Sequence, residues 1–116
     1  MHELSLLATV VELVEQAATA AGAKKVQTVA LAVGTLSGAV PEALEGSWPI
    51  AILDHPLFTG AKLELHEIQA TVYCPQCQRD VPIDEFFALK CPECGAPTAN
   101  LTHGREFNVQ WAEWEK

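Results

Sequence analysis

The residues best suited to chemistry are four cysteines that occur as two close pairs. Cys74 and Cys77 lie in the stretch YCPQCQ, and Cys91 and Cys94 lie in KCPECG. The two residues within each pair allow one tight turn to aim both sulfurs at a single cation, and two facing turns complete a tetrahedron. Thirteen residues separate the pairs, slightly fewer than the ~15–20 of typical zinc ribbons. The pattern therefore predicts one metal site with four sulfur ligands.

The ligand type narrows the choice of metal. Four thiolates suit zinc, and they also suit the single iron of a rubredoxin-like site. Two disulfides or four free thiols would be unusual for paired C-x-x-C motifs in an acidic cytosolic domain. Pro75 and Pro92 favour the turns, and Gly95 can adopt the positive φ that often follows a second cysteine. Because all four positions around the ion would be filled, we expect structural zinc and no enzymatic activity.

The amino terminus offers a second set of metal ligands. The chain opens MHELSL, so the α-amine of Met1 and the amide and imidazole nitrogens of His2 can close fused chelate rings around one ion. A further amide or carboxylate from Glu3 would complete four-coordination. Planar, nitrogen-rich sites suit Ni²⁺ or Cu²⁺, and binding should weaken as pH falls because the nitrogens must lose protons. Glu3 by itself is better explained as an acidic residue at a helix N-terminus.

The remaining histidines are weaker candidates for metal binding. His66 lies in an alternating strand, where we expect it to pair with Glu64 or Glu67. His55 lies in a turn-rich connection, and His103 closes the cysteine segment as a loop residue.

The segments that must position these residues begin with a helix. Residues 3–21 carry a broad apolar side, which must pack against another element, and Gly22 is the expected stop. The opposite side is a polar stripe formed by Ser5, Thr9, Glu12 and Gln16. The apolar side consists of Leu4, Leu6, Leu7, Val10, Val11, Leu13, Val14 and Ala18.

A strand and a second helix are expected next. Residues 26–33 alternate between large and small apolar side chains, which predicts a strand covered on both sides. Pro41, followed by acidic residues, predicts the first turn of a helix. Pro49 lacks the N–H that a helix interior requires, so we expect a kink or an early end near Trp48.

The apolar register shifts by one residue within segment 61–72. Leu63 and Leu65 share one face, whereas Ile68, Ala70 and Val72 share the other. A slip of one residue exchanges the buried and exposed faces of a strand. It therefore marks either a bulge or the point where the chain leaves one core for another.

The chain ends in another strand. Phe107, Val109 and Trp111 alternate with polar residues, and we expect this strand to return to the first sheet, with the metal segment inserted between two neighbouring strands. The predicted fold class is α+β, a small mixed β-sheet with two helices plus an inserted zinc-ribbon or rubredoxin-like four-cysteine module. The expected domains are residues 1–70 with 104–116, and residues 71–103.

Composition limits the classes of function. The chain has 116 residues, 49% of them apolar, and a formal net charge of −8. Binding to nucleic acid or to anionic membranes requires clustered Lys and Arg, which are scarce here. No run reaches the ~18 apolar residues of a membrane span, and the first residues lack the basic region of a signal peptide. We therefore expect a cytoplasmic protein that binds neither nucleic acid nor membrane.

Several stretches together resemble the HypA/HybF family of hydrogenase nickel-insertion proteins. These are the opening MHELSL, the central VGTLSGAVPEAL, the paired CPQC and CPEC, and the closing GREFNVQWAEWE. The resemblance covers nearly the whole chain in the same order. It implies a nickel metallochaperone for the maturation of nickel–iron hydrogenase, with a small α/β nickel domain and a zinc domain inserted late in the chain.

The resemblance also implies ligands and partners. His2 would bind Ni²⁺ as transferable cargo, with Met1 and Glu3 contributing main-chain nitrogens, while the four cysteines hold structural zinc. The partners would be a nickel-handling GTPase of the HypB type and the hydrogenase large subunit, and some relatives also serve urease maturation. The expected oligomeric state is a monomer or a weak homodimer.

The residues alone leave other functions open. A zinc-ribbon adaptor that binds nucleic acid or a transcription complex would use the same cysteines. The acidity of the chain and its lack of an aromatic–basic face oppose that function. An iron electron carrier of the rubredoxin kind is a further hypothesis, which the four thiolates permit.

Overall fold

The computed structural model describes residues 2–84 and 90–116. The described part contains two α-helices, six β-strands and a short 3-10 helix, η1 (Pro56–Phe58). None of the described helices is long and apolar enough to span a bilayer.

The chain divides into two compact units. The first, here called the helix unit, contains the chain up to Ala32 together with Ala39–His66 and Asn108–Lys116. The second, here called the cysteine unit, contains Val33–Gly38 and the described part of Glu67–Phe107.

Helix α1 (His2–Ala20) confirms the first predicted helix and ends as its sequence indicates. Gly22 has a φ of +79°, and the N–H groups of Gly22 and Ala23 donate to the carbonyls of Thr19 and Ala18 at 3.0 and 2.9 Å. This glycine-dependent end satisfies carbonyls that the helix otherwise leaves free. The buried face of α1 consists of Leu7, Val10, Val11, Val14 and Ala18.

Leu13 is an exception to the apolar side predicted for α1. Its side chain is 60% exposed, although its sequence position places it next to the buried residues. At about 100° per residue, Leu13 lies roughly 60° beyond the arc that the buried positions cover. The buried face of this helix is therefore narrower than the predicted apolar side.

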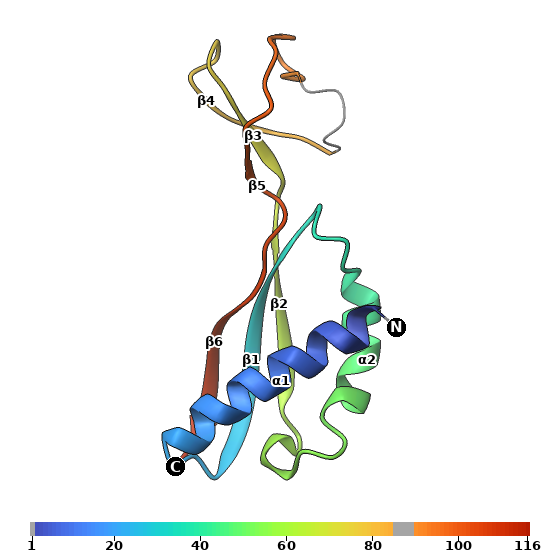
Figure 1. The fold of residues 1–116 in the computed structure, drawn as a ribbon, viewed down its shortest axis with the longest axis vertical. Coiled ribbons are helices and arrows are strands. Elements are labelled where there is room, and N and C mark those ends of the chain that lie inside the picture. Colours follow the sequence, from blue (N-terminus) through green and yellow to red (C-terminus); the bar gives the residue numbers. More distant parts are fainter. Residues whose placement is uncertain (1, 85–89) are drawn as a thin grey trace. The chain divides into compact units, whose positions relative to one another are not determined.

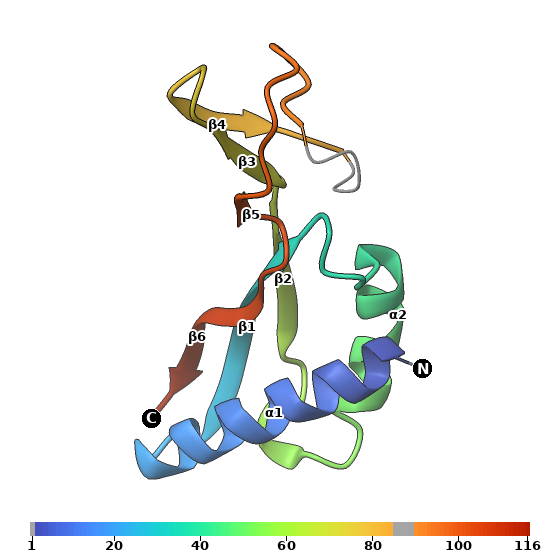
Figure 2. The same ribbon diagram turned by 45° about the horizontal axis from the view of Figure 1, so that its top comes forward.

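A three-stranded sheet has the strand order β2-β1-β6, and α1 crosses one of its faces (Figures 1 and 2). The strands are β1 (Lys25–Gly34), β2 (Lys62–Ile68) and β6 (Phe107–Glu115). Strand β1 is central and buried from Val29 onward, as predicted. Strand β6 returns to this sheet as expected. However, β1 lies between β2 and β6, so the prediction that the metal segment is inserted between two neighbouring strands is wrong.

Backbone hydrogen bonds explain this strand order. The N–H of Thr35 donates to the carbonyl of Ile68 at 2.9 Å, so β1 and β2 end side by side and run parallel. The N–H of Gly34 donates to the carbonyl of Glu106 at 2.7 Å, so β6 starts where β1 ends and runs antiparallel to it. Two parallel strands require a crossover connection, and α2 lies in the connection between β1 and β2. Strand β2 pairs with one edge of β1, and β6 pairs with the other.

Helix α2 (Pro41–Ala51) begins at the predicted proline but does not end early. It continues for two residues beyond Pro49, and the N–H of Ile52 donates to the carbonyl of Trp48 at 3.1 Å. Trp48 is buried, and its Nε1–H donates to the carbonyl of Ala61 at 2.9 Å. Of the two expected outcomes, an early end near Trp48 is wrong, because the contacts of this side chain outweigh one missing backbone hydrogen bond near the helix terminus. The kink stays a prediction.

The cysteine unit contains a second sheet, in which β3 (Thr71–Cys74) lies between β4 (Arg79–Pro82) and β5 (Leu101–His103). Both pairs are antiparallel, and the register places Cys74 opposite Arg79. The buried core of this unit consists of Ala70, Val72, Cys74, Val81, Ile83 and Cys91.

The shift in apolar register within segment 61–72 marks a change of core, the second of the two predicted alternatives. Strand β2 belongs to the first sheet, whereas Ala70 and Val72 are buried in the core of the cysteine unit. The chain therefore leaves one core for another between β2 and β3.

Two glycines in the cysteine unit bring backbone segments into direct contact. A Cβ on Gly34 would lie 2.1 Å from the carbonyl oxygen of Gly104, and a Cβ on Gly104 would lie 2.7 Å from the Cβ of Ala70. The N–H of Leu36 donates to the same Gly104 carbonyl at 2.7 Å. Neither backbone atoms nor the Cβ of an alanine can rotate away from a new side chain, so both positions require glycine.

Gly34→Ala should therefore destabilise the protein, whereas Gly46→Ala should stabilise it. Gly46 lies within α2, and a Cβ added there would have no heavy atom within 4 Å, so alanine should add about 0.5–1 kcal/mol through helix propensity. Gly34→Ala should cost roughly 2–4 kcal/mol because of the backbone clash. Denaturant unfolding of both variants measures this difference, and equal stability of the two would contradict the described contact.

Candidate functional site

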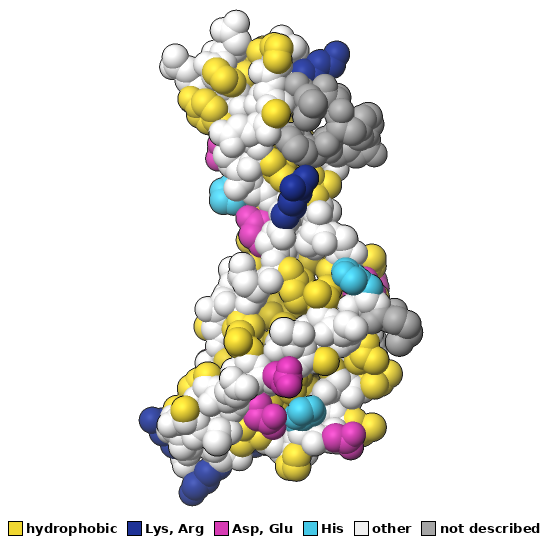
Figure 3. Space-filling model, in the orientation of Figure 1, with side chains coloured by type: hydrophobic (Ala, Val, Ile, Leu, Met, Phe, Trp, Pro, Cys, Tyr) yellow, Lys and Arg dark blue, Asp and Glu magenta, His cyan; other side chains and the backbone are white. Residues whose placement is uncertain are grey.

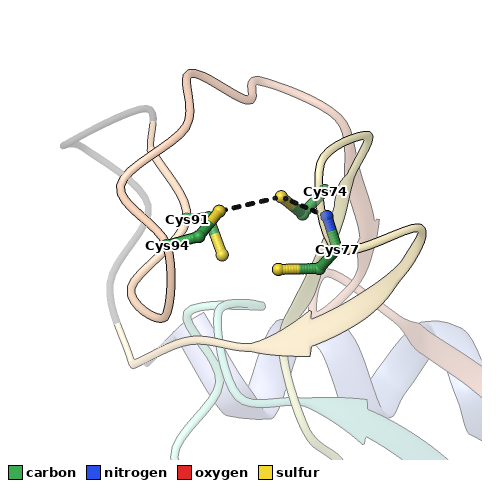
Figure 4. A group of neighbouring side chains, drawn as sticks. All are labelled: Cys74, Cys77, Cys91 and Cys94. Carbon is green, nitrogen blue, oxygen red and sulfur yellow. Dashed lines mark hydrogen bonds between the residues drawn. The ribbon is translucent and has the colours of Figure 1, made fainter.

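The four cysteine sulfurs converge on one point in the cysteine unit (Figure 4). All four Sγ atoms lie within 4.8 Å of one another, and those of Cys74 and Cys94 are 3.5 Å apart. Zinc–sulfur bonds of about 2.3 Å place tetrahedral sulfurs roughly 3.8 Å apart. The spacing of Cys74, Cys77, Cys91 and Cys94 therefore fits one tetrahedral ion, as the sequence predicts.

The two turns that carry these sulfurs differ by one position in their contacts to sulfur but share the backbone hydrogen bond that closes them. The N–H of Cys77, three residues after Cys74, donates to the Sγ of Cys74, and the N–H of Glu93, two residues after Cys91, donates to the Sγ of Cys91, both at 3.4 Å. Each turn is closed by the backbone: the N–H of Gln78 donates to the carbonyl of Cys74 at 2.7 Å, and the N–H of Gly95 to that of Cys91 at 2.9 Å. Hydrogen bonds to sulfur favour the thiolate, which is the form that binds metal.

The residue after each second cysteine has a positive φ. Gly95 has a φ of +77°, as predicted, and Gln78 has a φ of +55° at the equivalent position. The positive φ of Gln78 was not predicted, although an alignment of CPQCQ with CPECG matches Gln78 to Gly95. A positive φ is unfavourable for a residue with a side chain. The hydrogen bond from the Gln78 N–H to the Cys74 carbonyl, which closes the turn, offsets this cost.

The sulfurs differ in exposure and in acidity. Cys74 and Cys91 are buried, Cys77 is partly buried and Cys94 is exposed. The hydrogen bond from the Cys77 backbone lowers the pKa of the Cys74 thiol to about 7. Contacts with the sulfurs of Cys94 and Cys74 raise the pKa of Cys77 to about 12. Neighbouring thiolates resist joint ionisation without a cation, so the donor set fits a divalent ion that accepts four thiolates, above all zinc.

The predicted ligands at the amino terminus lie at the start of α1. His2 is the first residue of the helix and is exposed, whereas Met1 lies outside the described residues. The first N–H groups of a helix have no carbonyl one turn earlier, so metal binding to the amide nitrogens of His2 or Glu3 breaks no helix hydrogen bond.

The carboxylate of Glu3 has a different partner. Its Oε2 accepts a hydrogen bond from the N–H of Val40 at 3.2 Å. Val40 is the N-cap of α2, with no side-chain hydrogen bond of its own. A capping box would require Glu or Gln three residues later, but that residue is Ala43. The sequence therefore offers no nearby side chain to accept a hydrogen bond from the Val40 N–H, which could have indicated an acceptor from elsewhere in the chain.

The backbone N–H groups of Glu3 and Val40 lower the pKa of the Glu3 carboxyl below its ordinary value of 4.5. Both groups stabilise the charged form of the side chain. The carboxylate thus positions the start of α1 relative to α2 within the helix unit.

The other histidines each lie beside a carboxylate. Nε2 of His66 is 2.7 Å from Glu64, which confirms one of its two predicted partners. His55 lies 3.3 Å from Glu15, and the ring of His103 lies 3.0 Å from Glu106. Among the described residues, only the four cysteines form a cluster of three or more metal-ligating side chains. Lys and Arg side chains are few on the face drawn in Figure 3.

A two-helix sheet unit joined to a four-cysteine unit is the architecture of a small metal-handling protein. The profile of the family described as "Hydrogenase/urease nickel incorporation, metallochaperone, hypA" matches residues 1–114. The chain therefore belongs to the HypA family of hydrogenase maturation factors.

Relatives in this family extend over almost the full chain. A hydrogenase maturation factor HypA from Chloroflexus aggregans is 38% identical over 109 residues, which are 94% of this chain and 95% of the relative. The HypA of Moorella thermoacetica is 37% identical over 115 residues, which are 99% of this chain and 100% of the relative.

Solved structures share the fold. The solution structure of the Ni metallochaperone HypA from Helicobacter pylori is similar with a TM-score of 0.69 at 18% identity, and 97% of each chain is covered. A second solution structure of a HypA protein has a TM-score of 0.73 at 19% identity, with 98% of this chain and 96% of the other covered. At these identities the likeness establishes the α+β fold.

The equivalent positions Gln78 and Gly95 provide a reciprocal test of the two turns. Gly95→Ala should lower the stability of the cysteine unit by about 1 kcal/mol, because alanine is strained at the positive φ of this position. No atom lies within 4 Å of the new Cβ, so a steric clash does not contribute. Gln78→Gly should raise it by less than about 1 kcal/mol, since relief of strain exceeds the added freedom of the unfolded chain. Thermal unfolding of the metal-loaded variants measures both effects, and shifts of the same sign would argue against equivalent turns.

The Glu3–Val40 hydrogen bond should titrate in acid. Because the folded pKa of Glu3 is lowered, the contact is fully present above pH 4.5 and is lost as pH falls through the folded pKa. The Val40 amide resonance in NMR spectra should shift with a midpoint below 4.5. Glu3→Gln keeps an acceptor oxygen but removes the titration, so a wild-type-like midpoint in this variant would rule out Glu3 as the titrating group.

Proposed function

We propose that the protein is a nickel metallochaperone that binds Ni²⁺ at its amino terminus and delivers it during maturation of nickel–iron hydrogenase. The proposed ligands are the His2 imidazole and main-chain nitrogens of Met1, His2 and Glu3. The observation that carries the proposal is the position of an exposed His2 at the first turn of a helix, in a chain that belongs to the HypA family.

The chemistry of the terminus supports a role in transfer. Amine, amide and imidazole nitrogens suit a planar Ni²⁺ site. The carboxylate of Glu3 is occupied by the Val40 N–H, which favours a main-chain contribution from Glu3. Each amine or amide that binds releases a proton, so nickel affinity falls as pH falls. An exposed terminal site also leaves room for a second protein to supply competing ligands.

The four cysteines have a separate role in this proposal. Zinc bound by four thiolates has no open coordination position, so it stabilises the cysteine unit and performs no catalysis. The nickel domain would comprise residues 1–70 and 104–116, and the zinc domain residues 71–103. The protein acts as a carrier rather than an enzyme.

The proposed partners follow from family membership. They are a nickel-handling GTPase of the HypB type and the hydrogenase large subunit, together with urease maturation proteins in organisms that use HypA for both. The protein would work in the cytoplasm as a monomer or weak homodimer, without nucleic acid or membrane.

The nickel site can be tested with untagged protein that retains its own first residue. His2→Ala, or one extra residue before Met1, should abolish stoichiometric Ni²⁺ binding in calorimetry, because either change removes a nitrogen from the chelate. Zinc content, measured by elemental analysis, and the circular dichroism spectrum should stay unchanged. His66→Ala is a matched control, since His66 is a partly exposed histidine of the same unit that lies beside Glu64.

The control variant should bind nickel like the wild type. Unchanged nickel binding in both terminal variants would overturn the proposed site. Loss of nickel binding in the His66 variant would move the site to β2.

A further inference from the structure

An ion pair joins the two cysteine turns at the surface of the cysteine unit. Nη2 of Arg79, the first residue of β4, contacts Oε1 of Glu93, which lies between Cys91 and Cys94. About half of each side chain is exposed, 51% for Arg79 and 48% for Glu93. Nothing in the C-x-x-C pattern itself requires this contact, which adds a second link between the turns beside the four sulfurs.

Both members of the pair are fixed to the ligands through the backbone. Arg79 lies directly opposite Cys74 in the antiparallel register of β3 and β4. The N–H of Glu93 donates to the Sγ of Cys91 at 3.4 Å. Separation of the two turns therefore requires either rupture of the ion pair or a change in a backbone contact to a ligand.

Charge gives the arginine a second effect. Four thiolates around one Zn²⁺ carry a net charge of about −2, and Arg79 and Lys90 are the only Arg and Lys residues between Lys62 and Arg105. Arg79 follows Cys77 by two residues and lies opposite Cys74 in the register of β3 and β4, so it adds a positive charge close to the sulfur cluster.

We propose that the Arg79–Glu93 pair is a bridge that holds the two cysteine turns together and slows the loss of the metal. This inference rests on the proposed zinc at the four cysteines. Release of the ion begins when one turn moves away from the other, and the bridge opposes that movement. Arg79 and Glu93 are positioning residues, because neither coordinates the ion.

The rate of zinc release at fixed pH tests the bridge. Zinc-loaded wild-type protein is mixed with excess EDTA, and the sulfur–metal charge-transfer absorbance in the ultraviolet reports loss of the ion. Arg79→Ala and Glu93→Gln should each accelerate release about two- to five-fold, the range that exposed ion pairs allow. The double variant should release zinc no faster than the faster single variant, because both changes remove one interaction.

Lys90→Ala is the matched control for net charge. Lys90 is exposed and adjacent to Cys91, so the change removes one positive charge from the same unit and leaves the bridge in place. It should alter the rate less than Arg79→Ala does. The exchanged pair Arg79→Glu with Glu93→Arg keeps the net charge and should restore a rate close to that of the wild type.

The outcomes separate the bridge from the zinc centre. Equal acceleration by Arg79→Ala and Lys90→Ala, additive effects in the double variant, or no acceleration at all would overturn the bridge while the zinc centre stands. Wild-type protein that contains no zinc by elemental analysis would overturn both. Unchanged circular dichroism of the variants would show that accelerated release does not reflect unfolding.

Discussion

Repulsion between neighbouring thiolates is the constraint on which the cysteine unit depends. Four sulfurs lie within 4.8 Å of one another, and Cys74 and Cys91 are themselves buried in the core that the described residues of this unit form. Ionised sulfurs at this distance repel one another, whereas a shared cation makes the same four residues attract. Binding of a shared cation would therefore stabilise the fold of this unit.

The helix unit solves a different problem at the starts of its two helices. Each helix start leaves backbone N–H groups without partners, and α2 lacks both a side-chain cap and a capping box. Glu3 supplies the missing acceptor from the first turn of α1, through its contact with Val40. One carboxylate thus satisfies a backbone donor at the start of the second helix and links the first turn of α1 to it. The first N–H groups of α1 have no carbonyl one turn earlier, although that of Glu3 interacts with its own carboxylate.

Local chemistry was readable from the sequence, and long-range arrangement was not. The cysteine turns, the end of α1 at Gly22 and the positive φ of Gly95 each depend on residues within a few positions of one another, so spacing and residue type predict them. The position of β6 in the sheet depends on which edge of β1 is taken by β2. The residue pattern within β2 or β6 does not indicate that edge. Helix α2 continues past Pro49 because Trp48 is held by Ala61, a contact between segments. The Glu3–Val40 and Arg79–Glu93 contacts join residues that only the folded chain brings together. For the same reason, the register shift predicted a change of core or a bulge but could not decide between them.

The two proposed metal sites place opposite demands on the protein, and their donor sets differ accordingly. A stabilising ion must stay, so its ligands are two turns closed by backbone hydrogen bonds, with no vacant coordination position for an attacking ligand. A cargo ion must leave, so its proposed ligands lie on an exposed first turn where an incoming donor can bind before the others dissociate. Affinity alone would not keep the ions apart, since nickel and zinc bind many of the same donors. Geometry does so, because four sulfurs in a tetrahedron favour zinc and a plane of nitrogens favours nickel. The selectivity of each site thus follows from how the backbone presents its donors, and the two ions need not compete for one set of ligands.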